Sequence, residues 1–186
     1  QQIIALKNKI LLTGKVTFPG TLVADNVKIS FFDARFGFLS EFHPPLYSRS
    51  TNATGYYSFL IAPYNATVLC IVSFYYKGGS GRKSIKGLQL TSNRNLNIVI
   101  PIGMWNGTVV GADGIPVGGV AITGVSQGRK LGDTNHNYNS ISGSASASGK
   151  FSIGVMTELT VNPYIQFDFS PPSGSLYPET LFDSLM

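Results

Sequence analysis

The chain has 186 residues and a formal net charge of +5, and only 12% of its residues are charged. That charged share is about half of what soluble proteins usually carry, whereas 43% of the residues are hydrophobic, which is enough to build one or two domain cores. The basic residues are scattered rather than gathered in a stripe with exposed aromatics, which argues against nucleic-acid binding. The sequence has no apolar run of about 20 residues, so we expect no membrane-spanning helix.

The N-terminal stretch alternates apolar and polar side chains over residues 2–18, which is typical of a β-strand with one buried face. This pattern is too long for a single strand, because strands usually have about 5–6 residues. Residues 7–9 are polar and interrupt it, so we interpret them as a hinge. Residues 10–18 are then the first strand of a domain, and residues 1–9 are an extra strand and hinge ahead of it.

Further strand patterns, bounded by Gly, Pro, Asn and Asp, recur along the chain, and no long segment has a convincing helical period. Long loops are predicted at 34–54 and 126–139. Two domains are predicted, at residues 10–101 and 102–186. After the first strand, the predicted strands are 27–33, 56–62, 66–76, 85–91, 95–100, 105–111, 117–125, 140–146, 150–156 and 159–169.

The two halves of the chain repeat the same order of features. Each half has a Gly-x-Val strand, which contains Gly14 in the first half and Gly107 in the second, followed by a turn, another strand and a long loop. A small-polar run then ends in Gly55 or Gly149 and leads into a strand with alternating aromatics or aliphatics. We expect these two glycines to have positive φ in hairpin turns. Alignment of the halves leaves residues 1–9 without a counterpart in the repeat.

The repeat resembles the carboxypeptidase regulatory-like and transthyretin-like β-sandwich families, which share a Gly-x-Val strand, a Gly-x-Pro turn and a later Gly-x-Phe/Tyr-x-Phe strand. The second half carries the turn closely, as Gly114-Ile115-Pro116, whereas the first half has only Pro19-Gly20 there. The resemblance implies an all-β protein of two tandem Greek-key (immunoglobulin-like or transthyretin-like) β-sandwich domains with an N-terminal extra strand. It implies no particular activity.

No group of residues in the sequence points to catalysis. His43 and His136 are in predicted loops and lack zinc-ligand spacing. The nine carboxylates form no acid–base pair, and residues 133–137 have calcium-loop spacing with only one carboxylate. Cys70 is the single cysteine and lies in an apolar run, so we expect an inert core thiol. The predictions are therefore a protein that is not an enzyme, with no catalytic residues, cofactor or metal.

Three Asn-x-Thr sequons, at Asn52, Asn65 and Asn106, are candidate N-glycosylation sites. We expect Asn52 beside a turn and Asn65 in a strand connection, where a glycan would extend into solvent. The chain starts at Gln1, as a secreted protein does after its signal peptide is removed, although a chain truncated at its start would look the same. The predicted location is therefore extracellular, at the cell surface, with N-linked glycans.

Residues 2–6 (Gln2, Ile3, Ile4, Ala5 and Leu6) are an apolar segment ahead of a complete domain. Left uncovered, they would be an aggregation-prone strand, which argues against a disordered leader. Two interpretations remain open: the segment pairs within its own sheet, or it enters the next subunit by β-strand addition. In the second case, head-to-tail contacts between identical subunits do not close, so they produce a filament.

The N-terminal strand, the β-sandwich pattern, the low charge and the sequons together resemble subunits of archaeal surface threads, which are filaments assembled by donor-strand complementation. The resemblance implies that residues 2–6 are the donor strand of a structural subunit with a role in adhesion or biofilm formation. The sequence does not locate the acceptor groove. Two alternatives remain open: a secreted carbohydrate- or cell-surface-binding module that uses Tyr47, Trp105 and Tyr138, and a viral capsid or turret protein.

Overall fold

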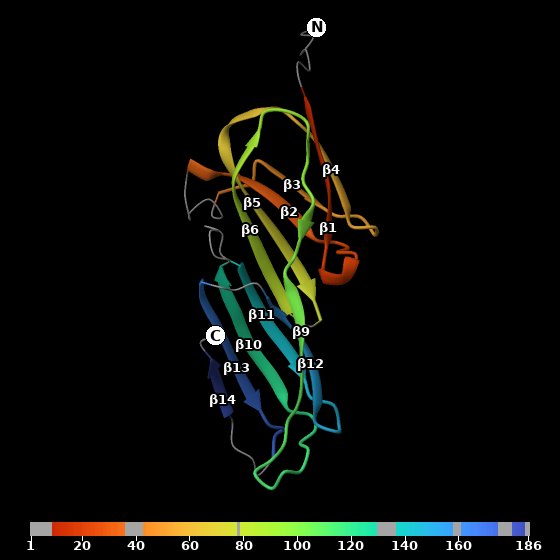
Figure 1. The fold of residues 1–186 in the computed structure, drawn as a ribbon, viewed down its shortest axis with the longest axis vertical. Helices are drawn as coiled ribbons and strands as arrows, with labels where there is room; N and C mark the ends of the chain where they lie inside the picture. Colours follow the sequence, from red (N-terminus) through yellow and green to blue (C-terminus); the bar gives the residue numbers. More distant parts are fainter. Residues whose placement is uncertain are drawn as a thin grey trace. The chain divides into compact units, whose positions relative to one another are not determined.

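The computed structural model describes residues 9–35, 43–77, 79–129, 137–157, 161–174 and 180–184. These residues form strands β1 to β14 and one short 3-10 helix, η1 (Pro19–Thr21), so the predicted all-β class is confirmed (Figure 1). The chain divides into two compact units. Unit 1 comprises Gln1–Ser73 and Ser84–Ile100, and unit 2 comprises Phe74–Lys83 and Pro101–Met186.

Unit 1 is built from two sheets. The strands of the first are β1 (Ile10–Thr17), β4 (Tyr56–Ile61), β7 (Arg94–Asn95) and β8 (Ile98–Val99). In this sheet β1 pairs antiparallel with β4 on one side and parallel with β7 and β8 on the other. The second sheet has the order β6-β5-β2-β3. Its strands are β2 (Lys28–Asp33), β3 (Tyr47–Ser50), β5 (Tyr64–Tyr76) and β6 (Gly79–Leu90).

The core of unit 1 lies between its two sheets, because strand residues alternate between buried and exposed faces. On β1, Leu12 and Val16 are fully buried. Phe31 of β2 and Phe59 of β4 meet edge to face, with ring centroids 5.5 Å apart. The opposite face of β2 is also apolar, since Phe32 packs in a second buried cluster with two residues of β5, Leu69 and Ile71.

Unit 2 also has two sheets. The smaller one contains only β9 (Ile102–Thr108) and β12 (Lys150–Met156) among the described residues. The larger one has the order β14-β13-β10-β11-β6, and Figure 1 shows its first four strands side by side. Those strands are β10 (Ala121–Arg129), β11 (Asn137–Ser144), β13 (Val161–Ser170) and β14 (Thr180–Ser184). Residues 80–83 of β6 pair with residues 137–140 of β11.

The two units share the backbone hydrogen bonds that define the repeat. In unit 1 the N–H of Val16 donates to the carbonyl of Gly55 (2.8 Å), and in unit 2 the N–H of Val109 donates to the carbonyl of Gly149 (2.9 Å). The two glycines have φ of 77° and 72°, as expected from the sequence. Strand β9 is therefore equivalent to β1, and β12 to β4. Counting back along the strands makes Trp105 equivalent to Leu12.

Both predicted long loops are partly strands, and the strand predicted at 85–91 begins earlier than expected. β3 lies within the predicted loop at 34–54, β10 extends to Arg129, and β6 already begins at Gly79. β3 reads Tyr-Ser-Arg-Ser and is mostly exposed, so it has no apolar alternation to reveal it. In β6, a Cβ atom at Gly79 would come within 2.4 Å of the Ser140 carbonyl oxygen, so glycine there permits close strand pairing rather than marking a loop.

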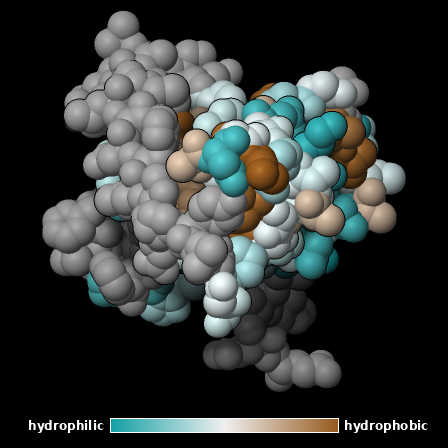
Figure 2. Space-filling view, turned by 90° about the horizontal axis from the view of Figure 1, so that it is seen from below, coloured by the Kyte–Doolittle hydropathy of each residue, from teal (hydrophilic) through white to brown (hydrophobic). Residues whose placement is uncertain are grey.

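Large apolar side chains that remain exposed are distributed over many elements. They include Leu60 on β4 and Tyr75 on β5, and, between β9 and β10, Val110 and Ile115. Figure 2 shows the hydrophobic residues in brown as separate patches among hydrophilic and intermediate ones on the face seen from below. Scattered residues of this kind are usual on soluble proteins and define no site by themselves.

Candidate functional site on strand β9

Strand β1 of unit 1 has hydrogen-bonded partners along both edges. One edge pairs with β4, and the other pairs with residues 93–100, which contain β7 and β8. We name residues 93–100 the edge segment. The N–H of Leu96 donates to the carbonyl of Thr13, and the N–H of Ile100 donates to the carbonyl of Thr17, both at 2.8 Å. The edge segment thus completes the sheet by parallel pairing.

Two asparagine side chains of the edge segment supply further acceptors to β1. The Oδ1 of Asn93 accepts the N–H of Leu11 (2.8 Å), and the Oδ1 of Asn97 accepts the N–H of Lys15 (2.9 Å). These are the N–H groups of β1 that point away from β4. These side-chain oxygens take the place of backbone carbonyls, so the N–H groups of β1 keep hydrogen-bond partners where the short strands β7 and β8 are interrupted.

The edge segment also closes the core of unit 1. Ile98 and Ile100 point inward and are 2% and 0% exposed, whereas Val99 between them is 55% exposed. Asn97, one residue before Ile98, is exposed as well. The segment therefore has one apolar face toward the core and one face toward solvent, as expected of a strand at the edge of a sandwich.

The fit between β1 and the edge segment is close at Leu96. The hydroxyl of Tyr57, on β4, donates to the Leu96 carbonyl at 2.6 Å, and burial raises the pKa of Tyr57 above its ordinary value. A Cβ atom at Gly14 would lie 2.0 Å from the same carbonyl oxygen. Only glycine at position 14 therefore allows the two backbones to approach this closely.

Strand β9, the equivalent of β1, has a different second edge. Hydrogen bonds from Val109 to Gly149 and from Thr157 to Pro101 show that the odd-numbered residues of β9 face β12. Antiparallel pairing alternates, so the N–H and C=O groups of the even-numbered residues point to the other side. In the described part of the chain, no strand pairs with that side. The even-numbered residues of β9 are Ile102, Met104, Asn106 and Thr108.

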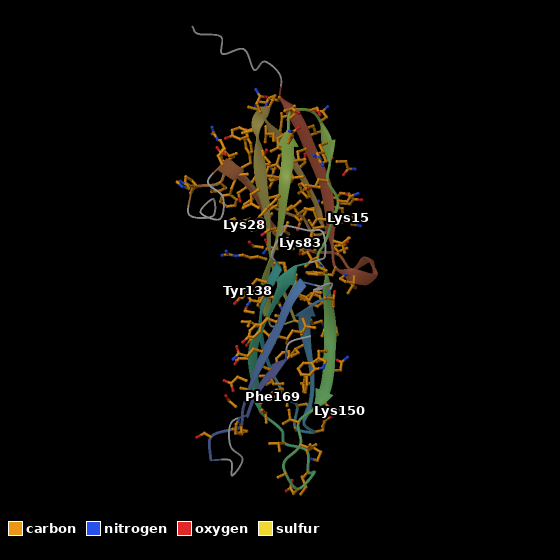
Figure 3. The ribbon with its side chains drawn as sticks, turned by 60° about the vertical axis from the view of Figure 1, so that its left-hand side comes forward. Lys15, Lys28, Lys83, Tyr138, Lys150 and Phe169 are labelled. Atoms are coloured by element: carbon orange, nitrogen blue, oxygen red, sulfur yellow. The ribbon has the colours of Figure 1, made fainter. Side chains whose placement is uncertain are left out.

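The core of unit 2 is correspondingly less covered. Four apolar side chains that pack against its buried cluster are themselves only partly buried: Trp105, Val109, Val155 and Phe169, the last of which is labelled on β13 in Figure 3. Their equivalents in unit 1 are at most 3% exposed: Leu12, Val16, Ile61 and Val72. The inward side chains of the edge segment, Ile98 and Ile100, have no described counterpart in unit 2. We name the unpaired side of β9, together with these four residues, the β9 edge.

The equivalents of Tyr57 and Gly14 fit this picture. Tyr57 is replaced by Phe151, which has no hydroxyl to donate, in line with the absence of a described third strand. At Gly107, the equivalent of Gly14, the three atoms nearest to a Cβ would all belong to the Phe151 ring, at 2.5 Å and beyond. The space that the edge segment occupies beside Gly14 is thus not taken by described backbone beside Gly107.

The predicted donor residues 2–6 lie outside the described residues. Of the three sequons, Asn52 is an exposed turn residue whose Oδ1 accepts the N–H groups of Thr54 (3.0 Å) and Tyr56 (2.9 Å). Asn65 is exposed near the start of β5, not in a connection, and Asn106 is exposed on β9. All three side chains are therefore at the surface of their unit, and glycosylation there stays a prediction.

The residues considered for chemistry are not gathered into a site. Cys70 is buried, and burial raises the pKa of its thiol to about 12, as expected for an inert core residue. His43 is an exposed loop residue, and His136 lies outside the described residues. Within the described ranges, no three His, Cys, Asp or Glu side chains are placed to hold a metal ion. Among the described residues, no helix is long and apolar enough to cross a membrane.

The sequence did not reveal the role of the edge segment. Residues 95–100 were predicted to be a strand, but not its parallel pairing to β1, which joins residues far apart in the chain. A signal was present, because asparagine alternates with apolar residues from Asn95 to Ile98, directly before the predicted domain boundary. That pattern is typical of a strand that offers polar side chains on one face and apolar ones on the other.

No protein-family model and no curated protein matches the chain. Among solved structures, it overlaps the shaft pilin SpaA (D295N mutant) of Lactobacillus rhamnosus GG, with a TM-score of 0.39, 10% identity and coverage of 95% of this chain and 94% of that one. It also overlaps a streptococcal ancillary pilin (TM-score 0.39, 13% identity, 96% and 59% covered) and the pilus backbone RrgB of Streptococcus pneumoniae (0.30, 9%, 96% and 58%). Overlaps this weak carry no inference about fold or function.

Proposed function

We propose that the protein is a structural subunit of an extracellular cell-surface filament, and that it polymerises by inserting residues 2–6 into the adjacent subunit. The observation that carries this proposal is the β9 edge, where unit 2 has no counterpart of the edge segment of unit 1 among the described residues. A sheet edge with free backbone groups and a partly open core is a template for an added strand.

The composition of residues 2–6 suits such an edge. Four of its five residues are apolar and none is charged, so as a strand it would offer Ile3 and Ala5 on one face and Ile4 and Leu6 on the other. Strand addition would give main-chain hydrogen bonds along this unpaired edge, and each fully buried Ile or Leu side chain would contribute about 1.5–3 kcal/mol. The outcome is a joint held by backbone pairing and apolar contact.

The topology of this contact leads to a filament. Donor and acceptor are different surfaces of the same chain, so the contact is heterologous, and each subunit can accept one neighbour while donating to another. Repetition of such a contact yields a head-to-tail polymer of identical subunits. The charge-poor surface, and glycans at Asn52, Asn65 and Asn106, suit a filament outside the cell with a role in adhesion or biofilm formation.

A carbohydrate-binding module has less support. Of the three aromatics that would stack on sugars, Trp105 is itself stacked on Phe167 in the core of unit 2, with ring centroids 4.3 Å apart. Tyr47 donates its hydroxyl to the Ala62 carbonyl (3.1 Å) on unit 1, and Tyr138 belongs to β11 of unit 2. A glycan array would still separate the two functions, since specific sugar binding by the monomer favours a module.

Deletion of residues 1–8 tests the proposed function. We expect the truncated protein to stay folded by circular dichroism, to elute as a monomer in sizing, and to form no filaments in electron microscopy. Full-length subunits should form filaments. When full-length subunits are added to truncated subunits, the donor strand of a full-length subunit should bind a truncated one. Filaments of the truncated protein, or a monomeric full-length protein, would contradict the proposal.

A further inference from the structure

We infer that residues 2–6 are the counterpart of the edge segment, and that they lie parallel to β9 of a second copy in the register that residues 93–100 adopt on β1. This inference rests on the proposed function and adds the acceptor strand, its direction and its register. The alignment of Gly14 with Gly107 does not reveal this equivalence between residues 2–6 and the edge segment, because it leaves residues 1–9 without a counterpart.

The order of elements along the chain supports the equivalence. The edge segment completes the β1 edge of unit 1 and then leads, through Pro101, into β9, the first strand of unit 2. Residues 2–6 lead in the same way, through the polar residues 7–9, into β1, the first strand of unit 1. Both segments therefore directly precede the first strand of a unit. One completes the preceding unit of the same chain, and the other is free to complete unit 2 of another copy.

The apolar pattern selects the register. In the edge segment the inward positions are those of Leu96, Ile98 and Ile100, and the two isoleucines are the most buried. Placing Ile4 at the position of Ile98 and Leu6 at that of Ile100 fills both buried positions with side chains of similar size. A shift by one residue would direct Ala5 inward and, two residues later, the ammonium of Lys7, which is costly to bury.

The pairing on β1 then translates to β9. In unit 1, Val16 is opposite Ile98, and Thr17 is opposite Val99. The equivalents of Val16 and Thr17 are Val109 and Val110, so Ile4 comes opposite Val109, and Ala5 opposite Val110. Ile4 thereby covers the partly buried Val109, and Leu6 follows it beyond the end of β9. Ala5 faces outward, next to Val110, which is 53% exposed.

Cysteine cross-linking tests this register. We compare Ala5→Cys/Val110→Cys with Ala5→Cys/Met104→Cys, in which the acceptor cysteine is also exposed but lies near the start of β9, whereas Val110 follows its end. The buried Cys70 is kept in both. Each variant with one introduced cysteine is first shown to form filaments by electron microscopy. After mild oxidation, we expect a ladder of covalent multimers on a non-reducing gel for the 5/110 pair and none above the single-cysteine background for the 5/104 pair.

Other outcomes separate the inference from the function on which it rests. A ladder from the 5/104 pair and not from 5/110 would overturn the parallel register. No ladder from either pair, in filaments that still require residues 1–8, would overturn the inferred register on β9 and leave strand exchange in place. Filaments that form without residues 1–8 would overturn the proposed function itself. A cross-linked species that runs only as a monomer would show that the segment completes its own chain, which also contradicts the inference.

Discussion

A single hydroxyl group distinguishes the two equivalent aromatic positions of the units. Tyr57 donates a hydrogen bond to the carbonyl of Leu96 in the edge segment, and Phe151 has no such group. If residues 2–6 follow the register of the edge segment, a hydroxyl at position 151 would reach the Gln2 carbonyl of the neighbouring subunit. One added hydrogen bond typically contributes about 0.5–1.5 kcal/mol.

We therefore predict that Phe151→Tyr slows the dissociation of subunits about 3- to 10-fold. Dissociation can be followed by exchange of fluorescently labelled subunits into preformed filaments. The matched control is Tyr57→Phe, which removes the same hydroxyl from unit 1. It should lower the unfolding free energy of the monomer by about 1 kcal/mol and leave subunit exchange unchanged. Faster exchange in Phe151→Tyr would argue against a donor carbonyl at this place.

Asp33 gives unit 1 a dependence on pH. Its carboxylate accepts hydrogen bonds from Arg35, with Nε at 2.9 Å from Oδ2, and from the Tyr64 hydroxyl. These bonds hold the pKa of Asp33 far below its ordinary value, with the Arg35 hydrogen bond as the main cause. A lowered pKa means that the stabilisation is fully present above the unfolded pKa of about 3.9 and is lost as pH falls toward the folded value.

We predict that the urea midpoint of the monomeric protein without residues 1–8, used here as the wild type, falls as pH drops below about 4. Asp33→Asn should have a lower midpoint at pH 7 and a flatter profile in this range, because it cannot exchange a proton there. Tyr64→Phe, which keeps the carboxylate and Arg35, should lie between the two. Fluorescence-monitored unfolding from pH 7 to pH 2 measures all three. An Asp33→Asn profile as steep as the wild type would show that other carboxylates dominate.

At the scale of elements, the donor strand is expected to have one essential face. The truncated protein without residues 1–8 should bind a labelled peptide of residues 1–8 in a fluorescence anisotropy titration. Ile4→Asp in the peptide should abolish binding, because it places a carboxylate in the core of unit 2. Ile3→Asn should be tolerated, because it copies Asn97, the equivalent outward residue of the edge segment. Equal loss from both changes would rule out a one-sided strand.

The strands that alternate clearly were predictable from the sequence, and those that do not were missed. β1, β4 and β12 alternate and were predicted nearly to their bounds. β3 is polar and mostly exposed, and the buried residues at the start of β6 are glycines, so neither shows apolar alternation in its sequence. Local periodicity shows that a strand exists, but its partner depends on contacts between distant residues. For this reason residues 95–100 were recognised as a strand without their parallel pairing to β1.

The candidate site was predictable only in part, because it is defined by what one unit has and the other lacks. Residues 2–6 stand out in the sequence as an apolar strand without a domain. The β9 edge does not, since Met104, Asn106 and Thr108 read as an ordinary exposed strand face. The difference appears only when the equivalent hydrogen bonds of the two units are compared: among the described residues, β1 is paired along both edges and β9 along one.

At the scale of the whole molecule, the proposed joint has no ionic component. Residues 2–6 carry no charge, and the described residues of the β9 edge are apolar or neutral. High salt screens ion pairs but leaves backbone hydrogen bonds and apolar burial intact or stronger. We predict that filament length and subunit exchange stay unchanged between about 0.01 M and 1 M NaCl, where the Debye length falls from about 30 Å to 3 Å. Disassembly at high salt, seen by electron microscopy, would indicate an electrostatic joint.

The two-stranded sheet of β9 and β12 has a consequence for how such a polymer lasts. A lone subunit would carry a domain whose folding is unfinished, and the arrival of a neighbour would supply its final element. Addition of a subunit to the filament and the last step of folding of its neighbour would then be one event. Removal of a subunit would require part of a domain to unfold, so the lifetime of the polymer would be set by an unfolding rate rather than by the affinity of two preformed surfaces.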